Sequence, residues 1–198
     1  MPRQLLLDGA IVNDPWRTPA ELEAIALEGA ALGAEARGAE ARGAAALAAA
    51  TLAAPGAEPA DSGAPLMLTF AQWSTQRDRW SAHRGLLGVI LAPADPVEAL
   101  VPDLPRFALL GAEFPGPGEG RGYTQGRLLR ERWYFEGELR ARGYVRQDQL
   151  FLLARCGFNS FELPESELEV GRIALATFSA AYQPANDSGL RRALRHRS

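Results

Sequence analysis

The sequence contains no lysine, so all 21 of its lysine-or-arginine positions are arginine. This absence excludes a P-loop phosphate lysine, a Schiff-base lysine and a lysine general base. Cysteine is almost absent as well, because Cys156 stands alone. A single cysteine cannot form an internal disulfide, and no CxxC motif or cysteine–histidine cluster is present to hold zinc or an iron–sulfur centre. We therefore expect a protein of a reducing compartment, without a metal site.

Strong net charge and long apolar runs are also missing. The 21 basic and 24 acidic residues leave a formal charge of -3, which gives no overall attraction to nucleic acid or to an anionic membrane. The first residues contain too short an apolar run for a signal peptide, and no apolar span of 18 residues follows. We expect a cytoplasmic protein that contacts neither membrane nor nucleic acid, and in which any anion site is local.

The N-terminal third divides into a hairpin and a low-complexity segment. The apolar runs QLLL and AIV flank Asp8-Gly9, a dipeptide favoured in tight turns, so residues 1–16 are predicted to form a small β-hairpin. Residues 24–64 are rich in alanine and glycine and repeat GAEAR at 33–37 and 38–42. This composition indicates a mobile insertion or linker, or alternatively a helix that forms on a partner. A basic tail over 184–198 is expected to be flexible.

From Leu66 onward, strand patterns alternate with helix patterns up to residue 183. Five strand–helix units predict an α/β domain over 66–183 with a mainly parallel sheet, either open or an incomplete barrel. If the strands follow one another in order, right-handed crossovers place every helix on one face. The other face must then be covered by the hairpin, the insertion or the second subunit of a homodimer.

The glycine-rich segment GPGEGRGYTQGR, residues 116–127, follows a strand and opens a helix that Thr124 is expected to cap. Backbone N–H groups beside Arg121 and Arg127 predict a pocket for phosphate, sulfate or carboxylate, although a plain surface turn fits as well. The glycine spacing does not match GxGxxG, and no GK[ST] follows. A Rossmann or P-loop site is therefore excluded.

Other polar side chains cluster around this segment in the predicted fold. Tyr123, Arg127 and Arg130 recur on one side of the helix, either to meet an anion or as a solvated face. Glu113 and Glu162 end apolar strands at the carboxyl edge, where they could form an acid–base pair or ion pairs with Arg121 or Arg140. Cys156 lies at the predicted end of a helix, just before the expected C-terminal glycine Gly157, and is predicted to be a buried, unreactive thiol.

The run EFPGPGEGRGYTQGRLLRERWYFEGELRARGYVRQDQLFLLARCGFNSFEL resembles a bacterial family, domain of unknown function 934. The most specific matching words are GRGYTQGRLLRER and RQDQLF, the latter containing Asp148, around which the family pattern is only partly reproduced. The likeness extends to LLLDGAIVNDPW and to nearly all of Leu66–Gln183. Members are labelled as oxidoreductases and tend to be encoded beside sulfite reductase and adenylylsulfate or phosphoadenylylsulfate reductase. The resemblance thus implies a role in assimilatory sulfate reduction.

Two functions follow as expectations, beside the plainer possibility of an enzyme of unrelated small-molecule chemistry on this α/β scaffold. The first is an accessory protein or oxidoreductase of sulfate or sulfite reduction that binds a small anion or an anionic cofactor, with Glu113 and Glu162 as candidate catalytic groups. Its candidate ligand-binding residues are Gly120, Arg121, Gly122, Tyr123, Arg127, Arg130, Arg140 and Asp148. The second is a non-catalytic adaptor that docks onto sulfite reductase or the sulfonucleotide reductase through Trp133, Tyr134 and Phe135. No flavin or nicotinamide fingerprint is present, so both catalysis and cofactor stay open.

Overall fold

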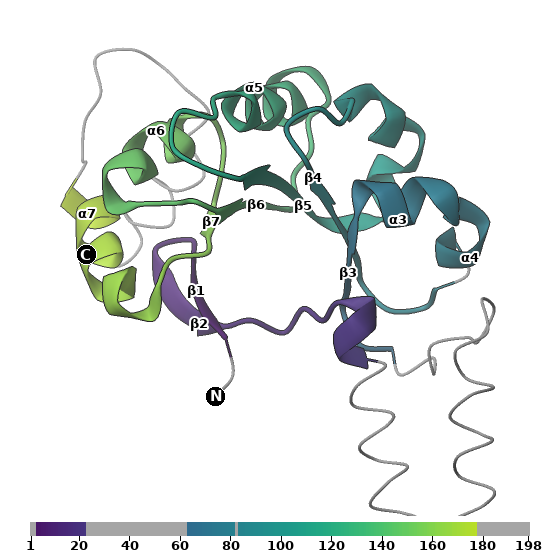
Figure 1. Cartoon of the computed structure of the whole chain (residues 1–198), viewed down its shortest axis with the longest axis horizontal. Coiled ribbons are helices and arrows are strands. Elements are labelled where there is room, and N and C mark those ends of the chain that lie inside the picture. Colours follow the sequence, from purple (N-terminus) through teal and green to yellow (C-terminus); the bar gives the residue numbers. More distant parts are fainter. Residues whose placement is uncertain (1–2, 23–62, 82, 178–198) are drawn as a thin grey trace, which may run out of the picture.

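The computed structural model describes residues 3–22, 63–81 and 83–177. Its centre is a seven-stranded sheet in the order β2-β1-β7-β6-β5-β4-β3 (Figure 1). The strands are β1 Gln4–Leu7, β2 Ala10–Asn13, β3 Leu66–Thr69, β4 Leu87–Leu91, β5 Phe107–Phe114, β6 Glu138–Gly143 and β7 Ser160–Phe161. Strands β3 to β7 are parallel, and β1 pairs antiparallel with both β2 and β7. The predicted α/β class with a mainly parallel sheet is confirmed.

The helices that connect and follow the parallel strands cover one face of the sheet, as the sequential strand order requires (Figure 1). They are α3 Phe70–Thr75, α4 Arg77–Ser81, η2 Val97–Arg106, α5 Arg121–Arg127, η3 Leu128–Arg132, η4 Gln147–Gln149, α6 Leu150–Arg155, η5 Glu165–Glu167 and α7 Leu168–Thr177. Within the described residues, no helix combines the length and apolar character needed to cross a membrane.

The main core lies between the sheet and these helices. Because side chains alternate along a strand, β5 sends Leu110, Ala112 and Phe114 into this core. The opposite face of β5 carries Gly111 and Glu113 instead. We call this opposite side the open face, because no helix of the described α/β units covers it (Figure 1).

The predicted N-terminal hairpin is present at the β7 edge of the sheet. Its turn places Asp8 at φ 50° and Gly9 at φ 77°. Two successive positive φ values are those of a type I′ turn, in which aspartate and glycine are favoured residues. The dipeptide therefore determines this turn from local chemistry alone.

Residues 14–17, here called the strap, leave β2 and cross the open face to the far edge of the sheet (Figure 1). There the Arg17 N–H donates to Pro65 O at 3.0 Å, and Arg17 O accepts from Met67 N–H at 2.7 Å. The Trp16 ring packs in a second cluster with Met67, Ile90 and Leu109. A side chain at Gly88 would meet this ring, which explains glycine in the middle of a buried strand. The segment after the hairpin thus covers much of the open face.

Several helix predictions need correction. Thr124 is not the N-cap of the helix after the glycine turn, because α5 begins at Arg121 with Gly120 in the cap position. The helix pattern expected between β4 and β5 forms a 3-10 helix at 97–106, because it contains Pro102 and Pro105, whose missing N–H groups interrupt α-helical bonding. The predicted insertion at 24–64 lies outside the described residues except for its last two positions. The predicted tail at 184–198 lies outside them entirely.

Candidate functional site

The carboxyl edge of the open face carries a row of three charged side chains. Strand register pairs Glu113 of β5 with Arg142 of β6. Glu162 follows β7 and lies on the other side of Arg142, because its N–H donates to Ala141 O at 3.0 Å. Arg142 Nε lies 3.5 Å from Glu162 Oε2. Adjacent strands are about 4.8 Å apart, so the two glutamate positions are about 10 Å apart with an arginine between them. They do not form a directly hydrogen-bonded acid–base pair.

Directly behind this row, Arg140 is buried on the open face. Its guanidinium donates to both oxygens of Asp14 at 3.0 and 3.1 Å, to Glu138 Oε1 at 2.8 Å and to Glu162 Oε1 at 3.2 Å. Exposed fractions of the Arg140 and Asp14 side chains are 1% and 2%. Of the two ion pairs predicted for Glu162, the one with Arg140 is therefore present.

Burial alone would lower the pKa of the Arg140 guanidinium, but the hydrogen bonds to Asp14 and the charge of Glu138 raise its pKa above the ordinary value. The carboxylates of Asp14, Glu138 and Glu162 therefore all lie against a permanent cation. Arg140 fixes the positions of these three carboxylates and, being buried, has no donor directed to bulk solvent. Its donors are engaged by the carboxylates of Asp14, Glu138 and Glu162, and its predicted role in ligand binding stays a prediction.

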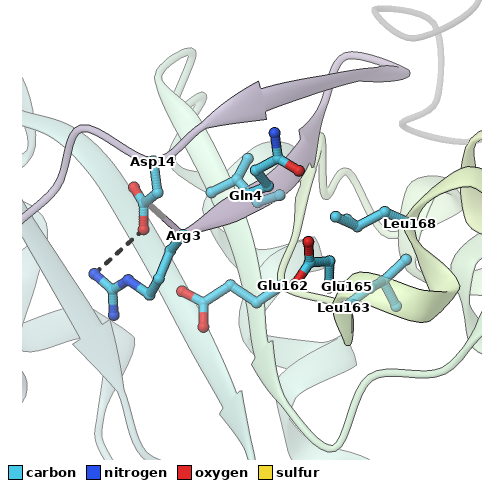
Figure 2. Close-up of a pocket in the computed structure, with 8 residues that line it drawn as sticks. Arg3, Gln4, Asp14, Glu162, Leu163, Glu165 and Leu168 are labelled. Carbon is cyan, nitrogen blue, oxygen red and sulfur yellow. Dashed lines mark ion pairs between the residues drawn. The ribbon is translucent and has the colours of Figure 1, made fainter. Parts of the chain in front are cut away.

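A pocket of about 310 Å³ opens beside this network (Figure 2). It lies where β1 passes β7, so it also belongs to the carboxyl edge. The lining residues are Arg3, Gln4, Leu5, Asp14, Glu162, Leu163, Glu165 and Leu168. Figure 2 shows Glu162 extending toward the ion pair of Arg3 and Asp14, whose charged atoms are 3.4 Å apart.

The two arginines expected to hold an anion at the glycine turn are engaged with glutamates. Arg121 contacts Glu119 at 2.8 and 2.9 Å, and Arg127 contacts Glu131 at 3.1 Å. The Arg121 side chain and backbone N–H lower the pKa of Glu119 to about 2. Glu113, expected to pair with Arg121, has no ion pair among the described residues. Both arginines therefore form surface ion pairs, which contribute little to stability and exchange easily.

Three further predicted ligand-binding residues have structural contacts. Arg130 donates to Gly157 O at 3.0 Å, to Asn159 Oδ1 at 3.3 Å and to the carbonyl of Phe135. Tyr123 packs edge-on against Phe114, and Gly122 leaves room for the same ring. Arg130 and Tyr123 therefore do not form one solvated row with Arg127. The π-helix η3 over Leu128–Arg132 also changes the helical spacing on which that row was based.

The remaining predicted residues lie away from the row. Gly120 is the exposed N-cap of α5, and Asp148 is exposed in η4. Cys156 is buried as predicted, and burial raises the pKa of its thiol. In the described part of the chain, no group of three or more histidine, cysteine, aspartate or glutamate side chains is placed to hold a metal ion.

Four charged residues of this site were not predicted, namely Arg3, Asp14, Glu138 and Arg142. Part of the signal was present in ELRAR, residues 138–142, because alternation along a strand places Glu138, Arg140 and Arg142 on one face. Asp14 gave no such signal, since its contact with Arg140 joins residues 126 positions apart.

Comparison with known proteins bears on the family. A search of curated proteins finds no match to this chain. A family model described as "Bacterial protein of unknown function (DUF934)" matches residues 88–191, which contain β5 to β7, β4 from its second residue on, and every residue of the carboxyl-edge row. That span is more than half of the 198 residues. The chain is a member of the bacterial DUF934 family.

Proposed function

We propose that this protein binds a small anion or an anionic cofactor at the carboxyl edge of its open face, and that it serves assimilatory sulfate or sulfite reduction as an accessory protein or an oxidoreductase. The pathway is supported by the resemblance that the sequence shows. The site is supported by the general tendency of parallel sheets to bind ligands beyond the carboxyl ends of their strands. The observation that carries the proposed anion site is that Arg142, at this edge, has unused hydrogen-bond donors.

Arg142 differs from the other arginines of this edge in its unused donors. Its side chain is 32% exposed, and its Nε makes a long ion pair with Glu162. Among the described residues, no partner accepts a hydrogen bond from its two terminal nitrogens. A planar guanidinium with two free, parallel donors matches the oxygens of a sulfate, phosphate or carboxylate group. Arg142 therefore replaces Arg121 and Arg127 as the proposed anion-binding residue.

The two glutamates beside Arg142 have different roles in this proposal. Glu162 forms ion pairs with both Arg140 and Arg142, so it links the two arginines and fixes the orientation of Arg142. Glu113 is exposed and has no ion pair within the described part of the chain. It is thus free to give a proton to, or take one from, an anion bound at Arg142.

A thermal-shift screen tests this proposal, with sulfite, sulfate, adenylylsulfate, flavins and nicotinamides as ligands. A ligand that binds the native state raises the melting temperature by mass action. We expect at least one anion to do so in the original protein and not in Arg142→Gln. Arg172→Gln is the control, because Arg172 is a surface arginine paired with Glu169 on α7. An equal shift in all three proteins, or no shift with any ligand, would contradict the anion site.

The pathway requires a separate test in cells. In a strain that needs this gene to grow on sulfate, Arg142→Gln should prevent growth on sulfate while growth on cysteine continues. Arg172→Gln should support growth on both sulfur sources. Growth of the Arg142→Gln strain on sulfate at the original rate would count against a role for this site in sulfate assimilation.

One observation favours the adaptor as a second candidate. Of the three aromatic residues expected at an interface, Phe135 is buried and Trp133 packs against the core, but Tyr134 is 79% exposed. Tyr134 also has φ 52°, an uncommon conformation for a tyrosine, directly after the π-helix. Copurification with sulfite reductase or the sulfonucleotide reductase tests this idea. Tyr134→Asn should abolish the association because it removes the exposed aromatic ring. The fold should be kept, since asparagine tolerates the same backbone conformation.

A further inference from the structure

We propose that the pocket beside Glu162 binds an organic cation, with an ammonium or guanidinium group on a short aliphatic body. This site is distinct from the proposed anion site, because Arg142 does not line the pocket. Glu162 is the residue that the two sites share. The pocket volume of about 310 Å³ is within the range of small-molecule sites in proteins.

The charges that line the pocket are predominantly negative. Asp14, Glu162 and Glu165 contribute three carboxylates, whereas Arg3 is the one lining arginine. Arg3 is already used, because it donates to Trp16 O at 3.1 Å and lies 3.4 Å from Asp14 and 3.7 Å from Glu21. An anionic ligand would therefore have to displace existing ion pairs to reach it.

The neighbouring arginines do not remove this negative excess. Arg140 is shared by Asp14, Glu138 and Glu162, and Arg142 reaches Glu162 alone at 3.5 Å. Glu165 has no ion pair with any described residue. One carboxylate at the mouth is thus uncompensated, and a ligand cation placed there would not compete with an existing protein cation.

Part of the pocket wall is apolar, which favours a ligand with an aliphatic body. Leu5, Leu163 and Leu168, which are almost fully buried, supply the apolar part of its lining. In Figure 2, Glu165 lies near Gln4, between Glu162 and the leucines Leu163 and Leu168. An alkyl chain on these leucines would leave its charged head near Glu165 and Glu162. A metal cation would gain nothing from this apolar wall, so the chemistry favours an organic cation.

Isothermal titration calorimetry with a charge-matched series tests the inference. The probes are butylammonium, butylguanidinium, butyrate and 1-butanol, which share an alkyl chain and differ in the charge of the head group. We expect the two cations to bind at least tenfold more tightly than butyrate or butanol. Equal or tighter binding of butyrate or butanol, or no heat of binding from either cation, would overturn the proposal.

Variants locate the binding at this pocket. Glu165→Gln should weaken binding of the cations at least fivefold, and folding should be unaffected because Glu165 is exposed. Glu136→Gln, at an exposed glutamate outside the pocket lining, should leave the affinity unchanged. An unchanged affinity in Glu165→Gln would overturn the assignment. The two sites can be tested separately, because Arg142→Gln should lose anion binding and still bind the cations. If the anion proposal is wrong, anions will not bind the original protein either, whereas the cations still will.

Discussion

Asp14 accepts two hydrogen bonds from Arg140, at 3.0 and 3.1 Å, and thereby attaches the strap to the middle of the sheet. Both side chains are buried, so the charge of each depends on the other for compensation. The same Arg140 also fixes Glu138 and Glu162. A contact between the strap and β6 therefore determines the geometry of the candidate site.

Removing the carboxylate of Asp14 should destabilise the protein strongly. We expect Asp14→Ala to lower the free energy of unfolding by about 3–5 kcal/mol, because it leaves the Arg140 charge buried and partly uncompensated. Urea denaturation followed by circular dichroism measures this change. Asp103→Ala is the matched control, since Asp103 pairs with the more exposed Arg77, and its cost should be about 1 kcal/mol or less. Similar costs for the two variants would show that the strap contact contributes no more than a surface ion pair.

Glu119 should titrate well below an ordinary glutamate. Its pKa of about 2 results from the hydrogen bonds of the Arg121 side chain and backbone N–H. Because the pKa of Glu119 is depressed in the folded state, the stabilisation is fully present above its ordinary pKa of 4.5 and is lost as the pH falls toward 2. Carbon-detected NMR titration of the Glu119 carboxyl measures this pKa. In Arg121→Ala the midpoint should move up toward 4.5; an unchanged midpoint would exclude the side-chain hydrogen bond as the cause.

Gly157 should not tolerate a side chain. Its φ is 99°, and an added Cβ would collide with the side chain of Arg130, which itself donates to Gly157 O. We expect Gly157→Ala to lower the free energy of unfolding by about 2 kcal/mol or more. Gly116→Ala is the control, because no atom lies near its added Cβ, and chemical denaturation of both variants provides the comparison. Equal stability of the two variants would show that neither the backbone conformation of Gly157 nor its contact with Arg130 requires glycine at this position.

Cys156 should be protected from alkylation in the native protein. Burial raises the pKa of its thiol, so at neutral pH the reactive thiolate is scarce as well as inaccessible. Mass spectrometry after treatment with iodoacetamide should show little modification in buffer and complete modification in guanidinium chloride. Rapid modification under native conditions would mean that this segment opens readily.

Local sequence patterns were sufficient for much of the fold. The alternation of strand and helix patterns after Leu66 predicted the parallel sheet and the placement of the helices on one face. Asp8-Gly9 predicted the hairpin, and Gly157 the end of α6, because each conformation depends on the residues at that position. Glu113 and Glu162 were correctly placed at the carboxyl edge, since strand direction alone determines which ends meet there.

The charge pairings at the site were decided by tertiary structure. The sequence placed the anion site at Arg121 and Arg127, but each pairs with a glutamate two or four positions away along the chain, as the alternative of a solvated face allowed; the pairs of Arg140 and Arg142 are those that the fold decided. Which arginine keeps free donors depends on which carboxylates the fold brings near it, and those come from distant segments.

The sequence by itself determined the mainly parallel α/β class, the hairpin and the edge at which Glu113 and Glu162 lie, because these follow from local backbone preferences and strand direction. Tertiary structure alone decided that Asp14 crosses the open face to neutralise Arg140. It thereby left Arg142 with unused donors at the edge and Glu165 without an ion pair among the described residues at the pocket. The physical reason is that electrostatic compensation depends on distance in space, which residues 126 positions apart acquire only on folding.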